Sequence, residues 1–259
     1  MEKRSGMSAA VLKYLAALFM LVDHWGMVFQ PMEPFVGPES LLYYLPRYVG
    51  RLAFPIFAYF VAEGCRRTHY FPKYLIRLGI FAAVAEIPYL LTTGVAGGSV
   101  VLTFFLAAGA IYAFREISRR ENASPALALI PLLAACVLAL FLNTDYGLPG
   151  VLLVFALYLC GEDRKKLLLC MGVGLALIYL VYHPMLGVLS LPALTPGMIG
   201  AYLGQTIPLH LLYALCAEAA LLLLSRYNGR LGVQSKWFFY WFYPLHLLVL
   251  WVIKLLIAA

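Results

Sequence analysis

Three ionisable residues lie within one long apolar segment near the start of the chain. The segment runs from about Met7 to Phe29 and contains Lys13, Asp23 and His24. It is long enough to cross a bilayer as a helix, and ionisable side chains inside a membrane usually mark a functional site. In a helix, Lys13 and His24 share one face at a separation of about 16 Å. A neutral imidazole takes and returns a proton near physiological pH, so His24 is a candidate general base.

Asp23 belongs to the same candidate site, although it points about 100° away from His24 around the helix. We expect it to meet a cation such as Arg51 from the next helix rather than to orient the histidine. The residues expected to approach His24 from elsewhere in the chain are Asp145, Tyr146 and His246. His246, in the sequence FYPLHLL, is the rival base, and hydrogen-bonded packing is the alternative role for it. No metal site is predicted.

A second group of charged residues consists of cations beside the second apolar segment. These are Arg66, Arg67, Lys73 and Arg77. Cations at the ends of membrane spans usually retain a helix in the membrane and contact anionic lipids. The alternative is a site for a phosphorylated cosubstrate that enters from the cytoplasm. The cluster alone does not decide between these two roles.

The composition indicates a membrane protein. Hydrophobic residues make up 64% of the chain and charged residues 12%, which leaves too little polar surface to cover a soluble globule. The net charge of +7 does not predict nucleic-acid binding, because the cations fall in short loops between apolar segments. The five cysteines lie in or beside apolar segments and are interpreted as packing residues. The apolar segment after MEKR is too long for a signal-peptide core, so we expect a retained first span.

The pattern predicts an all-α, polytopic helical bundle that forms one domain over residues 1–259, with nine or ten transmembrane helices. The nine clear spans are Met7–Phe29, Tyr48–Gly64, Tyr74–Leu91, Val100–Phe114, Pro125–Leu142, Leu148–Cys160, Leu167–Tyr182, Leu209–Leu224 and Trp237–Ile257. The stretch from His183 to Pro208 is rich in proline and glycine, which favours a broken, re-entrant or interfacial piece. A tenth span results if this stretch crosses.

The distribution of basic residues predicts the orientation in the membrane. Only Arg47, Arg51 and Lys254 fall on one side. The other side holds Lys3, Arg4, Arg66, Arg67, Lys73, Arg77, Arg115, Arg119, Arg120, Arg164, Lys165, Lys166, Arg226, Arg230 and Lys236. Cytoplasmic loops carry the excess of Lys and Arg, so the N-terminus is expected in the cytoplasm.

Five sequence blocks spread over nearly the whole chain carry a family resemblance. They are LKYLAALFMLVDHWG, GRLAFPIFAYFVAEG, RLGIFAAVAEIPY, TDYGLPGV and RYNGRLGVQSKWFFYWFYPLHLL. In this order they resemble the TraX family of integral membrane proteins, whose founding member is known for N-terminal acetylation of conjugative pilin. More widely the chain resembles the transmembrane acyltransferase superfamily, which includes acyltransferase 3 proteins and glucosaminide N-acetyltransferase. That superfamily has a basic residue, ten intervening residues and a catalytic histidine in its first span, which Lys13 and His24 match.

The resemblance implies a membrane acetyltransferase of the cytoplasmic membrane. It would move acetyl from cytoplasmic acetyl-CoA to a hydroxyl or amine on an exported glycan, lipid or peptide. His24 would be the base, flanked by Asp23 and Arg51. The residues implied in acetyl-CoA binding are Lys13, Arg66, Arg67, Lys73 and Arg77. The tight R-x-x-R pattern of acyltransferase 3 proteins is missing here.

Two other classes of protein fit parts of the pattern. A secondary transporter also needs intramembrane Asp, Glu and His, and it explains a broken segment over 183–208. It does not need the cations beside the second span. A non-catalytic membrane component of a conjugation or secretion assembly uses the charged residues only for packing.

Overall fold

The computed structural model describes residues 6–29, 41–94, 97–121 and 124–258, and these ranges are helical apart from their connections. Beyond one isolated bridge between Met7 and Tyr227, they contain no β-structure. The elements are α1 (Ala9–Phe29), η2 (Leu41–Tyr44), α2 (Leu45–Gly50), α3 (Ala53–Arg67), α4 (Phe71–Thr93), α5 (Val100–Ser118), α6 (Pro125–Phe141), α7 (Gly147–Leu159), α8 (Arg164–Leu177), η3 (Ile178–Tyr182, a π-helix), α9 (His183–Leu189), α10 (Pro196–Ser225) and α11 (Lys236–Ala258). The predicted all-α class is confirmed.

Six helical segments in the described ranges are long and apolar enough to cross a membrane. They are Ala9–Phe29, Phe71–Thr93, Val100–Ser118, Arg164–Leu189, Pro196–Ser225 and Lys236–Ile257. The helices α6 and α7 are apolar but shorter. The predicted count of nine or ten spans is therefore not confirmed.

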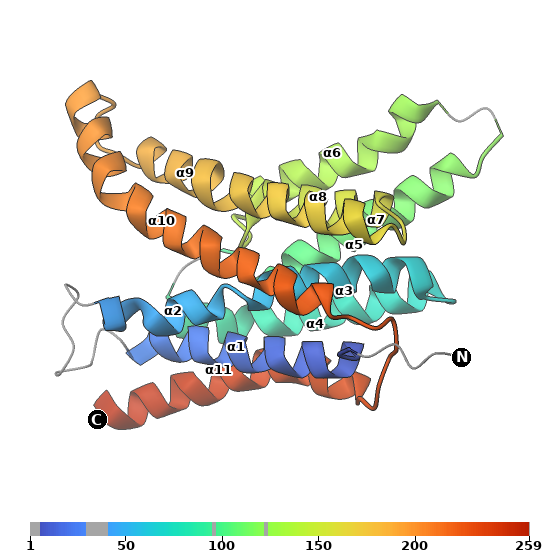
Figure 1. Ribbon diagram of the computed structural model, residues 1–259, viewed down its shortest axis with the longest axis horizontal. Coiled ribbons are helices and arrows are strands. Elements are labelled where there is room, and N and C mark those ends of the chain that lie inside the picture. The colour runs from blue at the N-terminus through green and yellow to red at the C-terminus, as the bar shows by residue number, and fades with distance from the viewer. Residues whose placement is uncertain (1–5, 30–40, 95–96, 122–123, 259) are drawn as a thin grey trace.

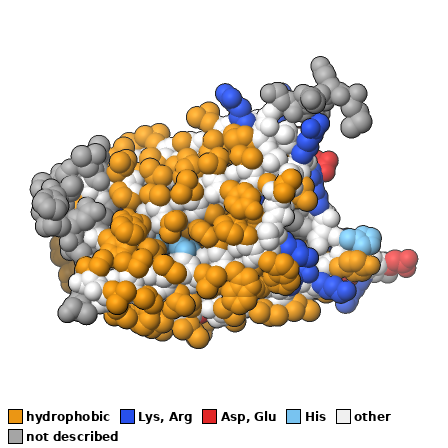
Figure 2. All heavy atoms as spheres, turned by 90° about the horizontal axis from the view of Figure 1, so that it is seen from below, with side chains coloured by type: hydrophobic (Ala, Val, Ile, Leu, Met, Phe, Trp, Pro, Cys, Tyr) orange, Lys and Arg blue, Asp and Glu red, His pale blue; other side chains and the backbone are white. Residues whose placement is uncertain are grey.

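The helices run roughly along the long axis of the molecule, with α3 in the middle (Figure 1). The first helix, α1, lies beside the last, α11, and α3 contacts α1, α5, α7 and α10. Small side chains allow this close approach, since Ala58 and Ala62 on α3 and Ala107 on α5 are fully buried. Outward-facing side chains are mostly large and apolar and cover the surface seen in Figure 2. The bundle therefore brings α1, the carrier of Lys13 and His24, against both α3 and α11.

Basic side chains gather at the end of the bundle where α1 begins, on the right of Figure 2. We call this the basic end, and it includes the end of α3 and the starts of α4 and α8, with Arg66, Arg67, Lys73 and Arg164. Lys3 and Arg4, which the sequence places on the same side, lie outside the described residues. His24 lies about 22 Å along α1 from its first residue. The site at His24 is therefore remote from the basic end.

The stretch from His183 to Pro208 is not one regular span: it contains the end of one long helix, a break over 190–195 and the first part of α10, so the expected break is present but short. Helix α8 continues through the π-helix and α9 as far as Leu189, and α10 begins at Pro196. Pro184 and Pro208 lie inside helices, where neighbouring groups and local changes of helix type compensate for the missing N–H group. Only the connection 190–195 interrupts the helix.

Local signals set several helix ends. Gly94, with φ of 68°, ends α4 in the left-handed conformation that favours glycine. Asp163 caps α8, where its carboxylate accepts from the N–H groups of Lys166 (3.2 Å) and Lys165 (3.0 Å). These hydrogen bonds hold the pKa of Asp163 below its usual range. The α7–α8 connection is thereby fixed at the basic end.

Candidate functional site

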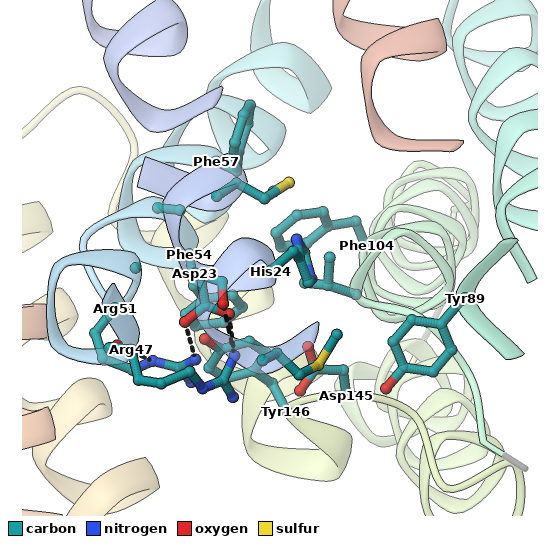
Figure 3. A pocket seen from close by; sticks show the side chains of 15 residues that line it. Asp23, His24, Arg47, Arg51, Phe54, Phe57, Tyr89, Phe104, Asp145 and Tyr146 are labelled. Atoms are coloured by element: carbon teal, nitrogen blue, oxygen red, sulfur yellow. Dashed lines mark hydrogen bonds and ion pairs between the residues drawn. The ribbon is translucent and has the colours of Figure 1, made fainter. Parts of the chain in front are cut away.

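The site is built around Asp23 of α1 and two arginines from the segment that follows η2. Arg47 Nη1 lies 2.6 Å from Asp23 Oδ2, and Arg51 Nη2 lies 2.5 Å from Asp23 Oδ1 (Figure 3). The Arg51 Nε–H also donates to the Arg47 carbonyl at 3.1 Å, since α2 places the two arginines one turn apart. Only 11% of the Asp23 side chain is exposed. The carboxylate is therefore fully engaged by two cations in a largely buried setting.

The contact between Asp23 and Arg51 is the one that the sequence predicts. Sequence reasoning missed Arg47 at this site and counted it only among the few cations on the outer side. The available signal is the spacing of Arg47 and Arg51, because cations four residues apart in a helix lie on one face. With Asp23 as the intramembrane carboxylate, this spacing indicates a cluster of Asp23, Arg47 and Arg51.

A polar pocket adjoins this cluster. Its cavity volume is about 110 Å³, and its polar lining comes from α1, α2, the α2–α3 connection, α4 and the α6–α7 connection. The lining residues that carry ionisable groups are Asp23, His24, Arg47, Arg51, Tyr89, Asp145 and Tyr146. In Figure 3, Tyr89 enters from the side opposite the two arginines. The structure thus brings His24, Asp23, Arg51, Asp145 and Tyr146 around one cavity, and adds Tyr89 to them.

His246 of α11 contacts His24 directly. Its Nε2 lies 2.9 Å from His24 Nδ1, and its Nδ1 lies 2.7 Å from the Phe242 carbonyl oxygen. The Phe242 ring stacks on the His246 imidazole, with ring centroids 4.7 Å apart. His246 does not line the polar pocket. Of the two candidate bases, only His24 therefore faces that cavity.

The α6–α7 connection delivers Asp145 and Tyr146. Tyr146 has φ of 62°, a conformation that is uncommon for a residue with a side chain, and its ring stacks on Phe54 with centroids 3.6 Å apart. Its hydroxyl lies 3.2 Å from that of Tyr179. The Thr103 hydroxyl donates to the Asp145 carbonyl. The Asp145 carboxylate forms no ion pair with any described residue, which leaves it available within the pocket.

A second, apolar pocket of about 210 Å³ lies next to the polar one and contains Lys13. The two pockets share four lining residues, Met20, Phe57, Val100 and Phe104. The Lys13 ammonium lies 4.9 Å from the centre of the Phe60 ring and 5.8 Å from that of Phe239. It has no ion pair within the described ranges. A single cation therefore stands in an aromatic chamber that adjoins the site of His24.

The other predicted cofactor-binding cations do not share this chamber. Arg66 and Arg67 line a third pocket of about 200 Å³, together with Arg164 and Glu63. Arg66 donates to the Leu157 carbonyl at 2.7 Å, and Arg67 Nη2 lies 3.3 Å from Glu63 Oε1.

This third pocket lies against Tyr59 and Glu63 of α3, whereas the apolar pocket uses Phe60 and Gly64 of the same helix. Lys73 and Arg77 line none of the three pockets, although Tyr74 and Leu78 beside them line the apolar one. Helix α3 therefore separates the predicted cations into two groups. Arg66 and Arg67 lie at the third pocket, whereas Lys13, Lys73 and Arg77 lie in or beside the apolar pocket.

These features define a helical membrane protein with a polar pocket next to an apolar one. The family model for "TraX protein" matches residues 8–254, so the chain belongs to the TraX family. It is also 27% identical to "Probable fimbrial assembly protein FimC, serogroup H1" of Dichelobacter nodosus, over 96% of this chain and 97% of that protein. No solved structure matches the chain. The predicted family is confirmed.

Proposed function

We propose that this protein is a membrane acetyltransferase that moves acetyl from acetyl-CoA to a hydroxyl or amine acceptor, with His24 as general base. The acceptor would be an exported glycan, lipid or peptide, such as a pilin N-terminus. The proposed reaction would be of the kind carried out by the transmembrane acyltransferase superfamily, which the chain resembles in the spacing of Lys13 and His24. Membership of the TraX family supports a role in a pilus or conjugation system.

The observation that carries the proposal is the pair of adjoining pockets along α1. Lys13 lines the apolar pocket and His24 the polar pocket, and the four shared residues form a common wall. A flexible, largely uncharged arm that carries a thioester fits an apolar chamber, and an acceptor that loses a proton fits a polar one. The thioester and the acceptor would meet beside His24.

The transfer step needs one base. The acceptor oxygen or nitrogen attacks the thioester carbonyl carbon while its proton passes to His24. The bond from carbon to sulfur then breaks, and the proton passes from His24 to the departing thiolate. Asp23 is bound by Arg47 and Arg51, so its role would be to fix the site rather than to take the proton. Asp145 and Tyr146 would contact the acceptor.

The donor's phosphates would bind toward the basic end, which we propose faces the cytoplasm of a plasma-membrane protein. Lys13 is the cation closest to the path of the arm, because it alone among the predicted cations lines the apolar pocket. Lys73 and Arg77 flank that pocket on α4, whereas Arg66 and Arg67 lie across α3. Lys13 should therefore matter most for donor binding.

A non-catalytic assembly component is the second candidate, because the relative named above carries the description "fimbrial assembly". In that role the buried ion pairs and the histidine pair would serve packing alone. A transporter gains little support from the stretch 183–208, because its interruption at 190–195 is the connection between two long helices and does not divide either of them. Catalysis is what separates the first candidate from the other two.

The test compares cells that lack the gene with cells that carry the wild type, His24→Ala or His69→Ala. Mass spectrometry of envelope glycans, lipids and exported peptides would look for a gain of acetyl. His69 is exposed at the basic end and serves as the matched control. We expect acetylated product with the wild type and with His69→Ala, and none with His24→Ala. Acetylated product with a folded His24→Ala protein would overturn the assignment and move it to His246.

A further inference from the structure

The two histidines at the site are held in a defined chain of hydrogen-bonding groups. The chain runs from the Phe242 carbonyl to Nδ1 of His246, and from Nε2 of His246 to Nδ1 of His24. His24 comes from α1 and His246 from α11, which lie side by side (Figure 1). Both residues are at least nine-tenths buried. The two hydrogen bonds therefore determine which ring nitrogen of each histidine carries a proton.

The direction of the chain follows from its first member. A carbonyl oxygen only accepts, so Nδ1 of His246 must carry a proton. In a neutral imidazole the other nitrogen is then an acceptor, which makes Nε2 of His246 the acceptor toward His24. His24 must therefore donate from Nδ1. In neutral His24, this leaves Nε2 without a proton.

The surrounding charges favour the neutral pair. Neither imidazole forms an ion pair with a described carboxylate, neither with Asp23, whose oxygens are bound by Arg47 and Arg51, nor with Asp145 in the same pocket. Tyr243 presents its ring to His24 edge-on, with centroids 6.0 Å apart, and adds no charge. A buried cation without a partner is costly, and the two arginines nearby repel a further positive charge. Each imidazole accordingly carries a single ring N–H proton, which is on Nδ1 in both His24 and His246.

We infer that His246 is a positioning residue that holds His24 in the tautomer protonated at Nδ1, so that Nε2 of His24 is the atom that accepts the acceptor's proton. The inference deepens the proposed function and rests on it. As the acceptor bonds to the acetyl carbon, its proton moves to Nε2 of His24; as the bond from carbon to sulfur breaks, that proton moves to the CoA sulfur. The proton between His24 and His246 stays on Nδ1 of His24. His246 itself touches neither donor nor acceptor in this scheme.

Two variants of His246 test the inference through activity. His246→Leu removes the acceptor for Nδ1–H, whereas the side-chain oxygen of His246→Gln supplies another acceptor. With acetyl-CoA as the added donor and membranes carrying each variant, we expect His246→Leu to lower transfer about 10- to 100-fold, the effect typical of removing a residue that orients a functional histidine. Binding of acetyl-CoA should stay unchanged, and His246→Gln should recover most of the rate. Transfer by His246→Leu at the wild-type rate would overturn the inference.

A measurement without catalysis decides the tautomer itself. Nitrogen NMR of ¹⁵N-histidine-labelled wild-type protein in micelles should show His24 protonated at Nδ1 and unprotonated at Nε2, with the His24 signals assigned by their loss in His24→Ala. The opposite tautomer would overturn the inference even if transfer depends on His24. If no acetyl transfer occurs in the wild type, the proposed function fails and the catalytic part of the inference fails with it. The NMR result would then stand only for the hydrogen-bonded chain.

Discussion

Gly50 packs directly against Asp23, so closely that a β-carbon added to Gly50 would overlap the Asp23 carboxylate and its Cβ. Gly50 is the last residue of α2, between Arg47 and Arg51. The backbone of α2 can approach α1 only because this residue has no side chain. The glycine is thus what allows both arginines to reach one carboxylate.

Replacing Gly50 by Ala should destabilise the protein by about 1–3 kcal/mol, because the extra carbon forces α2 away from Asp23. Thermal unfolding of the purified protein in detergent measures the effect. Gly109→Ala is the matched control, because Gly109 also lies in a helix but has open space around the added carbon. An unchanged melting temperature for Gly50→Ala would contradict the prediction and show that α2 can move away from Asp23 without a loss of stability.

Replacing Asp23 by Asn should cost more, about 3–5 kcal/mol, because it leaves two largely buried guanidinium groups without their carboxylate. The same thermal unfolding measurement applies. Asp163→Asn is the control, since Asp163 pairs with Lys166 at an exposed position and Asn also caps helices well. Equal stability of Asp23→Asn and the wild type would mean that the arginines find other partners.

Replacing Lys13 by Ala should weaken acetyl-CoA binding by about 1.5–3 kcal/mol, the range for losing one hydrogen bond to a charged group. Arg66→Ala and Arg67→Ala should weaken it less, because both arginines already contact protein groups. Titration of each purified variant with acetyl-CoA gives the dissociation constants. Should Arg66→Ala lose affinity while Lys13→Ala keeps it, the phosphates bind in the third pocket instead.

The orientation predicts opposite labelling of two engineered cysteines. Lys165→Cys at the basic end and Ser190→Cys in the α9–α10 connection lie at exposed positions at opposite ends of the helix Arg164–Leu189. In intact cells, a membrane-impermeant thiol reagent should label Ser190→Cys and not Lys165→Cys. Permeabilised cells provide the control, in which both should react. Labelling of Lys165→Cys in intact cells would show that the basic end faces outward and that the proposed orientation is wrong.

Local sequence patterns predicted the helix that carries the site. The bounds expected for the first span, Met7–Phe29, differ from those of α1 by two residues at one end. The pairing of Asp23 with Arg51 followed from helical geometry and the cost of an unpaired charge. The helix bounds and this ion pair depend only on segments that are close in sequence, so they can be predicted without knowledge of the fold.

The remaining features depend on contacts between distant segments. The sequence named His246 among the residues that would approach His24, but it did not predict the hydrogen bond between the two rings, because α1 and α11 meet only in the folded bundle. The placement of Lys13 and of Arg66 and Arg67 in different pockets likewise depends on which face of α3 each pocket adjoins. The break expected over His183–Pro208 is confined to 190–195, because prolines such as Pro208 are accommodated inside a helix. The sequence therefore named most candidate residues and the pairing of Asp23 with Arg51, but not the other contacts among them.

Helix α7 has 13 residues and is about 20 Å long, shorter than the roughly 30 Å hydrocarbon core of a bilayer. In Figure 1 the α6–α7 connection ends about halfway along the molecule, while α9 and α10 continue further toward the opposite end. Asp145 and Tyr146, which belong to this connection, therefore lie near the middle of the molecule's length and not at its end. Under the proposed function, an acceptor with its reactive group at the tip of a slender extension should therefore be a better substrate than one whose reactive group lies within a folded domain or a branched polymer.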